Sequence, residues 1–202
     1  MDNKERAFRF FRLAEQYAET AKLLLDTLMT NGNSNAGIGK TAEEALLKME
    51  KNAVKSDLYL FVPAIFNCLQ STELFIKGLL RLAGKDFELK HGVETLIEEL
   101  GKTYQDNSET YLAIRTFYIN QIGIIEQYKQ SNNLKTSKDL YMSLRYPEIS
   151  IWPNNMKHEI LVDYSDLVCN GDVGIEQFKL LAESLEAVKL AAVREYHTQC
   201  SL

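Results

Sequence analysis

The sequence predicts an all-α protein, an antiparallel up-and-down bundle of four main helices with several short ones. Apolar residues recur every three or four positions through long segments, which is the period of an amphipathic helix. Only 3 prolines occur in 202 residues, and the connections between the periodic segments are short, as in bundles. A chain of this length can bury a core without disulfides or metal ions, so a single domain over residues 1–202 is expected.

The first helix is predicted over about residues 2–29, and a short second helix follows a polar loop. The apolar face of the first helix consists of Phe11, Ala14, Ala18, Ala21, Leu25 and Leu28. Thr41 followed by Glu44 is a capping-box pattern, in which each residue bonds the backbone of the other. The second helix is therefore expected to begin after Thr41 and to end near Asn52.

The central helix is predicted over residues 57–83, with Pro63 near its start and Gly84 as its stop signal. A proline is tolerated in the first turn of a helix and kinks it further in, so both outcomes stay open. A short helix is expected from His91 to Leu100, ended by Gly101, because glycine readily adopts the left-handed geometry that closes helices.

One long helix is predicted over residues 108–128 and the last helix over residues 173–197. The buried face of the last helix is predicted to be Phe178, Leu181, Leu185, Val188 and Ala192. The segment between these helices, residues 131–172, is the least regular part of the sequence. It is expected to hold a short helix near 137–144, then either a small β-hairpin or an irregular flap near 148–163. Trp152 in that segment is either an interface anchor or a lid over the bundle end.

The net charge of -5 and the pI near 5.3 argue against broad electrostatic binding of nucleic acid, which requires a basic surface. A local basic groove at a dimer seam remains compatible with this balance. No stretch is expected to provide the roughly 20 apolar residues that span a bilayer, and no apolar signal core opens the chain. The expectation is a cytoplasmic protein without a membrane partner. Its three cysteines suit reduced thiols better than a disulfide frame or a zinc site.

A narrow polar stripe crosses the otherwise apolar central helix. Gln70, Glu73, Lys77 and Arg81 fall within a sector of roughly 80° on the helical wheel. Three interpretations remain open: an exposed ion pair one turn apart, a partly buried network that pins neighbouring helices or a dimer mate, and a ligand or catalytic groove. His91, at the start of the next helix, is either a cap or a general base.

Other chemistry finds little support in the sequence. Residues 37–41 end like a phosphate-binding loop, but Asn33 stands where the first glycine is required. Neither a His-Glu-x-x-His motif nor a nucleophile signature occurs. We therefore expect neither a metal nor a cofactor.

Three motifs in order along the chain resemble those of the HEPN family (higher eukaryote and prokaryote nucleotide-binding domains). They are Glu73-Leu74-x-x-Lys77-x-x-Leu80, His91-x-Val93-x-x-Leu96 and Arg145-Tyr146-Pro147. The resemblance spans about residues 57–197 and leaves residues 1–55 as an N-terminal helical extension.

The resemblance implies a dimeric helical bundle in a bacterial defence or toxin–antitoxin system, acting through a partner protein or through nucleotide or RNA binding. A homodimer is implied, and a nucleotidyltransferase is a candidate partner. The implied ligand or polar-network residues are Glu73, Lys77, Arg81, His91, Arg145 and Tyr146.

The sequence departs from the family's ribonuclease motif, in which four to six residues separate an arginine from a histidine. The three Arg-to-His intervals here contain nine, twelve and two residues. A non-catalytic role is therefore the main expectation. The alternative is an RNA-cleaving HEPN ribonuclease with a non-standard site, in which His91 acts on the 2′-hydroxyl and Arg145 steadies the phosphate.

Overall fold

The computed structural model describes residues 2–31, 39–54, 57–86, 92–105, 108–119, 123–152, 155–164 and 171–200. Within these ranges the protein is helical except for one two-stranded sheet, which confirms the predicted all-α class. The elements are α1 (Asn3–Asn31), α2 (Ala42–Ala53), α3 (Asp57–Leu82), α4 (Val93–Tyr104), α5 (Glu109–Ile119), α6 (Gly123–Ser131), α7 (Ser137–Ser143), β1 (Glu148–Ile151), β2 (His158–Leu161) and α8 (Gly171–Cys200).

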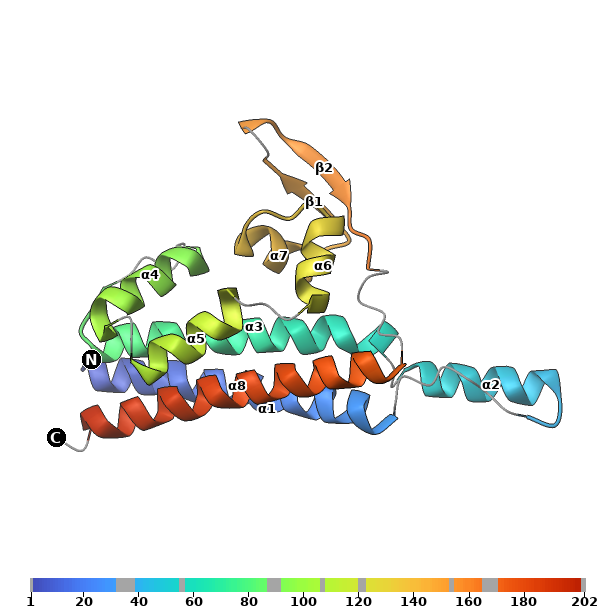
Figure 1. Cartoon of the computed structure of the whole chain (residues 1–202), viewed down its shortest axis with the longest axis horizontal. Coiled ribbons are helices and arrows are strands. Elements are labelled where there is room, and N and C mark those ends of the chain that lie inside the picture. The colour runs from blue at the N-terminus through green and yellow to red at the C-terminus, as the bar shows by residue number, and fades with distance from the viewer. Residues whose placement is uncertain are drawn as a thin grey trace.

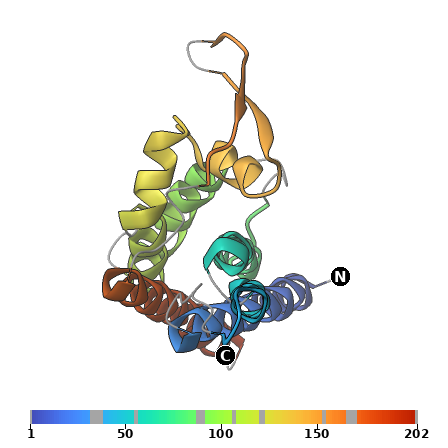
Figure 2. The ribbon, with the colours of Figure 1, turned by 90° about the vertical axis from the view of Figure 1, so that its right-hand side faces the viewer.

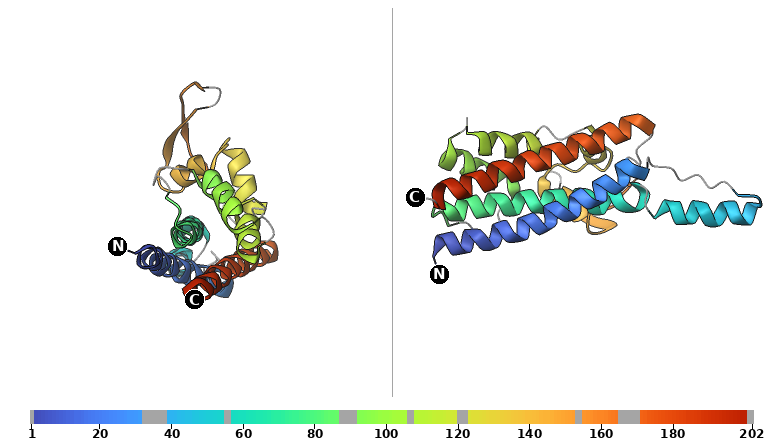
Figure 3. Two further views of the ribbon diagram at one scale, coloured as in Figure 1. Left: turned by 90° about the vertical axis from the view of Figure 1, so that its left-hand side faces the viewer. Right: turned by 90° about the horizontal axis from the view of Figure 1, so that it is seen from below.

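The body of the molecule is an up-and-down bundle, as predicted. Figure 1 shows α1 and α5 running in one direction along the body and α3 and α8 running in the other. Seen from below, α1, α3 and α8 lie side by side (Figure 3). The helix α2 extends beyond one end of the body, and Thr41 caps it as the sequence predicts, since its Oγ1 accepts from the Glu44 amide at 3.1 Å.

Small residues bring α1 and α3 close together. All six residues predicted for the apolar face of α1 are buried, and Ala7 joins them. In α3, the hydroxyl of Ser71 donates to the carbonyl of Ala14 at 2.8 Å. A Cβ on Gly78 would lie 3.3 Å from atoms of Phe10 and Phe11, so glycine suits this close approach. Because α1 shares one apolar core with α3 and α8, the bundle includes the first helix.

The core helix α3 corrects the expectation that no segment is long and apolar enough to span a bilayer. By length and composition, Tyr59–Leu82 is apolar enough to cross a membrane, with a mean hydropathy of 1.2. The body covers much of it, since 56% of the apolar window is buried. The core helix of a soluble protein shows the same combination of length, apolarity and burial. Pro63 lies inside this helix.

Two predicted helix boundaries were wrong. Gly101 does not end α4, which continues to Tyr104; the residue that leaves helical geometry is Gln105, with a φ of 66°. The long helix predicted over residues 108–128 is two helices, α5 and α6, which run in different directions (Figure 1). The second begins at Gly123, a residue that weakens a helix interior by roughly 1 kcal/mol relative to alanine.

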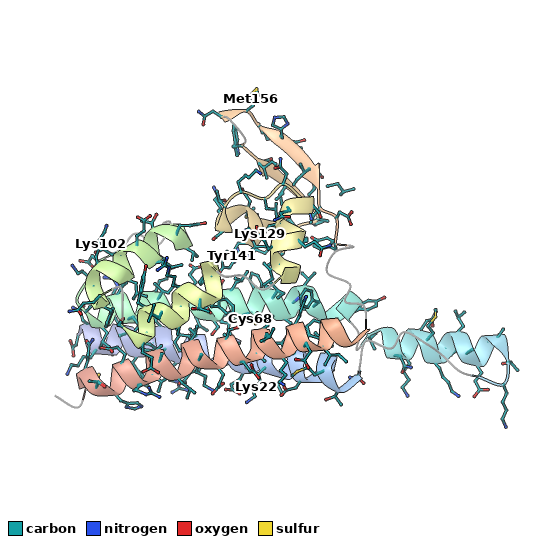
Figure 4. All side chains as sticks on the ribbon, in the orientation of Figure 1. Lys22, Cys68, Lys102, Lys129, Tyr141 and Met156 are labelled. Carbon is teal, nitrogen blue, oxygen red and sulfur yellow. The ribbon has the colours of Figure 1, made fainter. Side chains whose placement is uncertain are left out.

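The least regular segment contains the predicted short helix and the predicted hairpin. A capping box between Thr136 and Asp139 begins α7. The strands β1 and β2 pair antiparallel, with Glu148 opposite Leu161. The hairpin stands on the side of the body away from α1 (Figure 2), with Met156 near its outer tip (Figure 4). Trp152 is 63% exposed and therefore does not pack over the bundle end.

Candidate functional site

The ion pair between Glu73 and Lys77 lies largely inside the protein. The two side chains are one helical turn apart in α3, and they are only 17% and 10% exposed. This burial argues against the interpretation of the pair as an exposed surface contact. The buried ammonium group of Lys77 donates a hydrogen bond to the carboxylate of Glu73.

Two tyrosines from other helices extend this pair into what we call the buried polar network. The hydroxyl of Tyr118, on α5, donates to the carbonyl of Leu69 at 2.8 Å and lies 3.3 Å from the hydroxyl of Tyr141, on α7. Burial raises the pKa of Tyr141 well above its ordinary value, and the neighbouring Tyr118 and Glu73 add to that shift. Burial likewise raises the pKa of Tyr118. The network therefore joins α3, α5 and α7.

A second polar contact ties α4 to the start of α7. The carboxylate of Glu94 accepts a hydrogen bond from the Ser137 amide at 2.8 Å. Partial burial alone would raise the pKa of Glu94, but the hydrogen bonds to Ser137 outweigh it, and the net direction is downward. The carboxylate is thus held in its charged form at the first turn of α7, where the helix dipole favours an anion.

Arg81, the last residue of the polar stripe, reaches past the end of α3. Its guanidinium pairs with Asp86, beyond the end of α3, and Nη1 lies 3.5 Å from the carbonyl of Lys85. Arg81 therefore binds the segment that follows α3.

Arg145 and Tyr146 lie in the turn after α7, at the rim of an open hollow of about 580 Å³. The guanidinium of Arg145 sits 5.1 Å from the ring centroid of Phe66, on α3. Tyr146 is 51% exposed. We call this hollow the Arg145 groove; its lining residues are Val62, Pro63, Phe66, Leu144, Arg145 and Tyr146. It offers a cation and an aromatic face above an apolar floor.

Backbone hydrogen bonds fix the turn that carries these two side chains. The hydroxyl of Tyr164 donates to the backbone carbonyl of Ser143 at 2.7 Å. The same hydroxyl lies 3.3 Å from the backbone carbonyl oxygen of Tyr146. The amide of Val162 donates to the carbonyl of Pro147 at 2.8 Å. The segment that follows β2 therefore braces the turn, which lowers the entropic cost of presenting Arg145 and Tyr146 to a ligand.

Comparison with known protein families decides the relationship that these motifs suggest. The model of the HEPN domain matches residues 40–158, which is more than half of the chain. The chain belongs to the HEPN family. No curated protein and no solved structure shows a significant match. HEPN membership supports a role of the defence or toxin type, related to nucleotides or RNA, in general terms.

The HEPN match includes both the buried polar network and the Arg145 groove. His91, the predicted general base, lies outside the described residues. His158 is on β2 and exposed, and His197 is near the end of α8. Within the described ranges, no group of three or more His, Cys, Asp and Glu side chains has the geometry of a metal site.

The sequence identifies some residues of the buried polar network and of the Arg145 groove, but not the residues that they contact. It singled out Glu73 and Lys77, but the tyrosines that complete the network come from helices more than 40 residues away. The sequence identifies Arg145 and Tyr146, but it does not indicate that the ring of Phe66, on α3, lies under Arg145. The spacing of Pro63 and Phe66, three residues apart on α3, was the one available signal of a continuous apolar floor.

Proposed function

We propose that this HEPN protein is a cytoplasmic homodimer that binds RNA or a nucleotide in the Arg145 groove, in a bacterial defence or toxin–antitoxin setting. A nucleotidyltransferase is the candidate protein partner. The observation that carries the proposal is the pairing of an exposed cation with an exposed aromatic ring on a braced turn, with Arg145 over Phe66 and Tyr146 beside it.

The chemistry of the groove suits a phosphate next to a base. A guanidinium presents several N–H donors in a planar fork that matches phosphate oxygens. Single-stranded RNA is commonly recognised through bases that stack on aromatic side chains or on arginine planes. In this groove Arg145 would hold the phosphate and Tyr146 would stack on the base, with Pro63 and Phe66 beneath.

The buried polar network supports this groove from below. The ring of Tyr141 meets the ring of Phe66 edge to face, with centroids 6.3 Å apart. Tyr141 thus belongs to the network through its hydroxyl and supports the groove through its ring. In this proposal Glu73 and Lys77 hold α7 and α3 in place and do not touch the ligand.

The distribution of charge determines how strongly the affinity for RNA should depend on salt. The lining of the groove carries one cation, Arg145, in a protein of net charge -5, so we expect contacts with one or two phosphates and an affinity that falls only shallowly with salt. A long basic track would give a steep dependence. A short oligonucleotide or a nucleotide is therefore the ligand class to test first.

The test is a titration of labelled single-stranded RNA oligonucleotides and a panel of nucleotides against wild-type protein and Arg145→Ala. Loss of a charge-assisted phosphate contact should weaken binding about tenfold or more, equivalent to roughly 1.5–3 kcal/mol. Arg9→Ala is the matched control, since Arg9 lies on α1 with its side chain 66% exposed. Wild-type protein that binds no member of the panel, or Arg145→Ala protein that binds like the wild type, would overturn the proposal.

A further inference from the structure

One side of α8 carries a stripe of exposed residues that includes two leucines. Its members, which we call the α8 stripe, are Glu176, Leu180, Glu183, Ala187, Leu190 and Arg194. They recur every three or four positions, so they fall within a sector of roughly 80° on the helix. Leu180 and Leu190 are 49% and 51% exposed, although the opposite face of the same helix already packs in the core.

The stripe continues into a shallow groove between α8 and α5. The hollow has a volume of about 700 Å³, and its lining includes Leu112, Ala113 and Leu190. Leu112 is itself 45% exposed. At one end, Nη1 of Arg194 bonds both carboxylate oxygens of Glu109, at 2.7 and 2.6 Å. Figure 1 shows α5 and α8 adjacent along one side of the body. Exposed leucines gathered on two adjacent helices favour an interaction site.

Four of the six residues of the α8 stripe form matching pairs about position 185, and this pairing indicates what covers the stripe. Leu180 and Leu190 are equidistant from that position, and so are Glu176 and Arg194, which have opposite charges. In an isologous contact, residue i of one copy meets residue j of the other and the reverse. Two antiparallel copies of α8 would therefore place leucine against leucine, and Glu176 beside an Arg194 that already pairs with Glu109 of its own chain.

At the centre of the stripe, the exposed Glu183 of one copy would meet Ala187 of the other. Ala187 is exposed, and its small side chain lets two helix axes approach at the short end of the usual 8–10 Å range. Leu112 and Ala113 of α5 extend the apolar surface on the same side. In the paired arrangement they would flank Leu180 of the second copy.

We propose that the α8 stripe and the adjoining surface of α5 form a two-fold interface between two copies of this chain. The inference rests on the homodimer of the proposed function and names the surface that makes it. It places the interface on α5 and α8 and assigns each residue of the stripe its contact. The Arg145 groove, formed by α3 and the turn after α7, does not take part.

The test is the oligomeric state of Leu190→Glu, measured by light scattering during size-exclusion chromatography at micromolar concentrations. A carboxylate at position 190 would face Leu180 of the second copy twice in each dimer, so the dissociation constant should rise about 100-fold. Leu23→Glu is the matched control, because Leu23 is 68% exposed on α1 and should leave the dimer intact. Far-UV circular dichroism checks that each variant keeps its helices.

A double variant tests the register of the contact. Leu180→Lys/Leu190→Glu places a lysine against a glutamate across the two-fold axis, so it should recover a large part of the dimer that Leu190→Glu loses. Disulfide formation between chains carrying Leu180→Cys and chains carrying Leu190→Cys is the second measurement. This cross-link tests the contact between positions 180 and 190 even if a charged variant fails to fold. Its absence would overturn the inference.

The outcomes separate this inference from the proposed function. Wild-type protein that stays monomeric at micromolar concentrations would remove the homodimer and the interface together. A wild-type dimer that Leu190→Glu leaves intact would overturn the α8 interface alone. A wild-type dimer that only the α8 variants disrupt, with RNA binding through Arg145 unchanged per protomer, would support both.

Discussion

The buried polar network and the Arg145 groove lie next to each other above α3, yet they treat their charged residues in opposite ways. In the network, Lys77 and Glu73 are mostly buried and satisfy each other. In the groove, Arg145 lies over an aromatic ring and is exposed to solvent on its other side. The family motifs therefore contain two kinds of residue. Glu73 and Lys77 are buried and structural, whereas Arg145 is exposed and available to a ligand.

The largest expected effect is on the network. Lys77→Ala leaves the carboxylate of Glu73 in an apolar setting without its partner. Breaking a buried pair in this way costs about 3–5 kcal/mol, and the partial exposure of Glu73 favours the lower end of that range. Urea unfolding followed by circular dichroism would measure the loss.

Two further variants sharpen this result. Lys48→Ala removes the partner of Glu44 in an exposed pair with the same spacing, on α2, and should leave the stability nearly unchanged, because exposed ion pairs contribute little. The double variant Glu73→Leu/Lys77→Met replaces both charges with apolar groups and should recover most of the lost stability. Equal costs for Lys77→Ala and Lys48→Ala would contradict the burial that separates the two regions.

The next effect is a loss of stability at alkaline pH. Burial raises the pKa of Tyr118 and Tyr141 well above 10, whereas in the unfolded chain both ionise near 10. The contribution of each neutral tyrosine is thus fully present below pH 10 and is lost as the pH rises above it. Stability should fall by up to about 1.4 kcal/mol per pH unit for each of the two, and denaturant midpoints between pH 9 and pH 11 would show it.

A smaller effect is expected from removing one hydroxyl of the network. Tyr118→Phe deletes the donor to the carbonyl of Leu69 and leaves that buried acceptor without it, at a cost of about 1–3 kcal/mol. It should also reduce the fall in stability above pH 10, because only one buried tyrosine of the network then ionises. Tyr59→Phe, at a residue that is 56% exposed, is the control and should change neither quantity. A cost for Tyr59→Phe as large as that for Tyr118→Phe would count against the network.

In the groove, stability should hardly respond. Arg145→Ala removes a cation–π contact with Phe66 at a partly exposed site, which is worth about 0.5–1 kcal/mol. The same denaturation experiment measures this value. A loss of several kcal/mol would show that Arg145 is a structural residue.

The smallest expected effect concerns RNA cleavage. Because the arginine-to-histidine spacing of the family's ribonucleases is missing, purified protein should leave single-stranded RNA intact in the absence of metal, and His91→Ala should change nothing. Gel analysis after prolonged incubation measures this. Cleavage that disappears in both His91→Ala and Arg145→Ala would establish the alternative, a ribonuclease with a non-standard site.

Local periodicity was enough to predict the faces of the long helices. All the residues predicted for the buried sides of α1 and α8 are buried, because one apolar stripe per helix must face the core. Periodicity could not predict the break between α5 and α6, since Tyr118 and Ile125 are both buried and keep the same spacing across it. Glycine as a stop signal placed the end of α4 at Gly101, but that glycine is buried inside the helix.

The candidate sites were only half predictable for a related reason. Glu73 and Lys77 are four residues apart, so the sequence shows them as a pair. Tyr118 joins them only because α5, packed against α4 and α8, brings its hydroxyl to the Leu69 carbonyl of α3. Phe66 joins Arg145 only because the turn after α7 reaches the same helix. Contacts between distant segments depend on packing, which the local pattern does not encode.

The most direct test of the division between network and groove is RNA affinity, measured in parallel for Glu73→Leu/Lys77→Met and Arg145→Ala. The first variant removes every charge of the network and keeps the fold, so it should bind RNA like the wild type. The second should bind about tenfold more weakly or worse. Normal binding by Arg145→Ala together with lost binding by the folded double variant would contradict the account, because it would place the ligand on the buried pair.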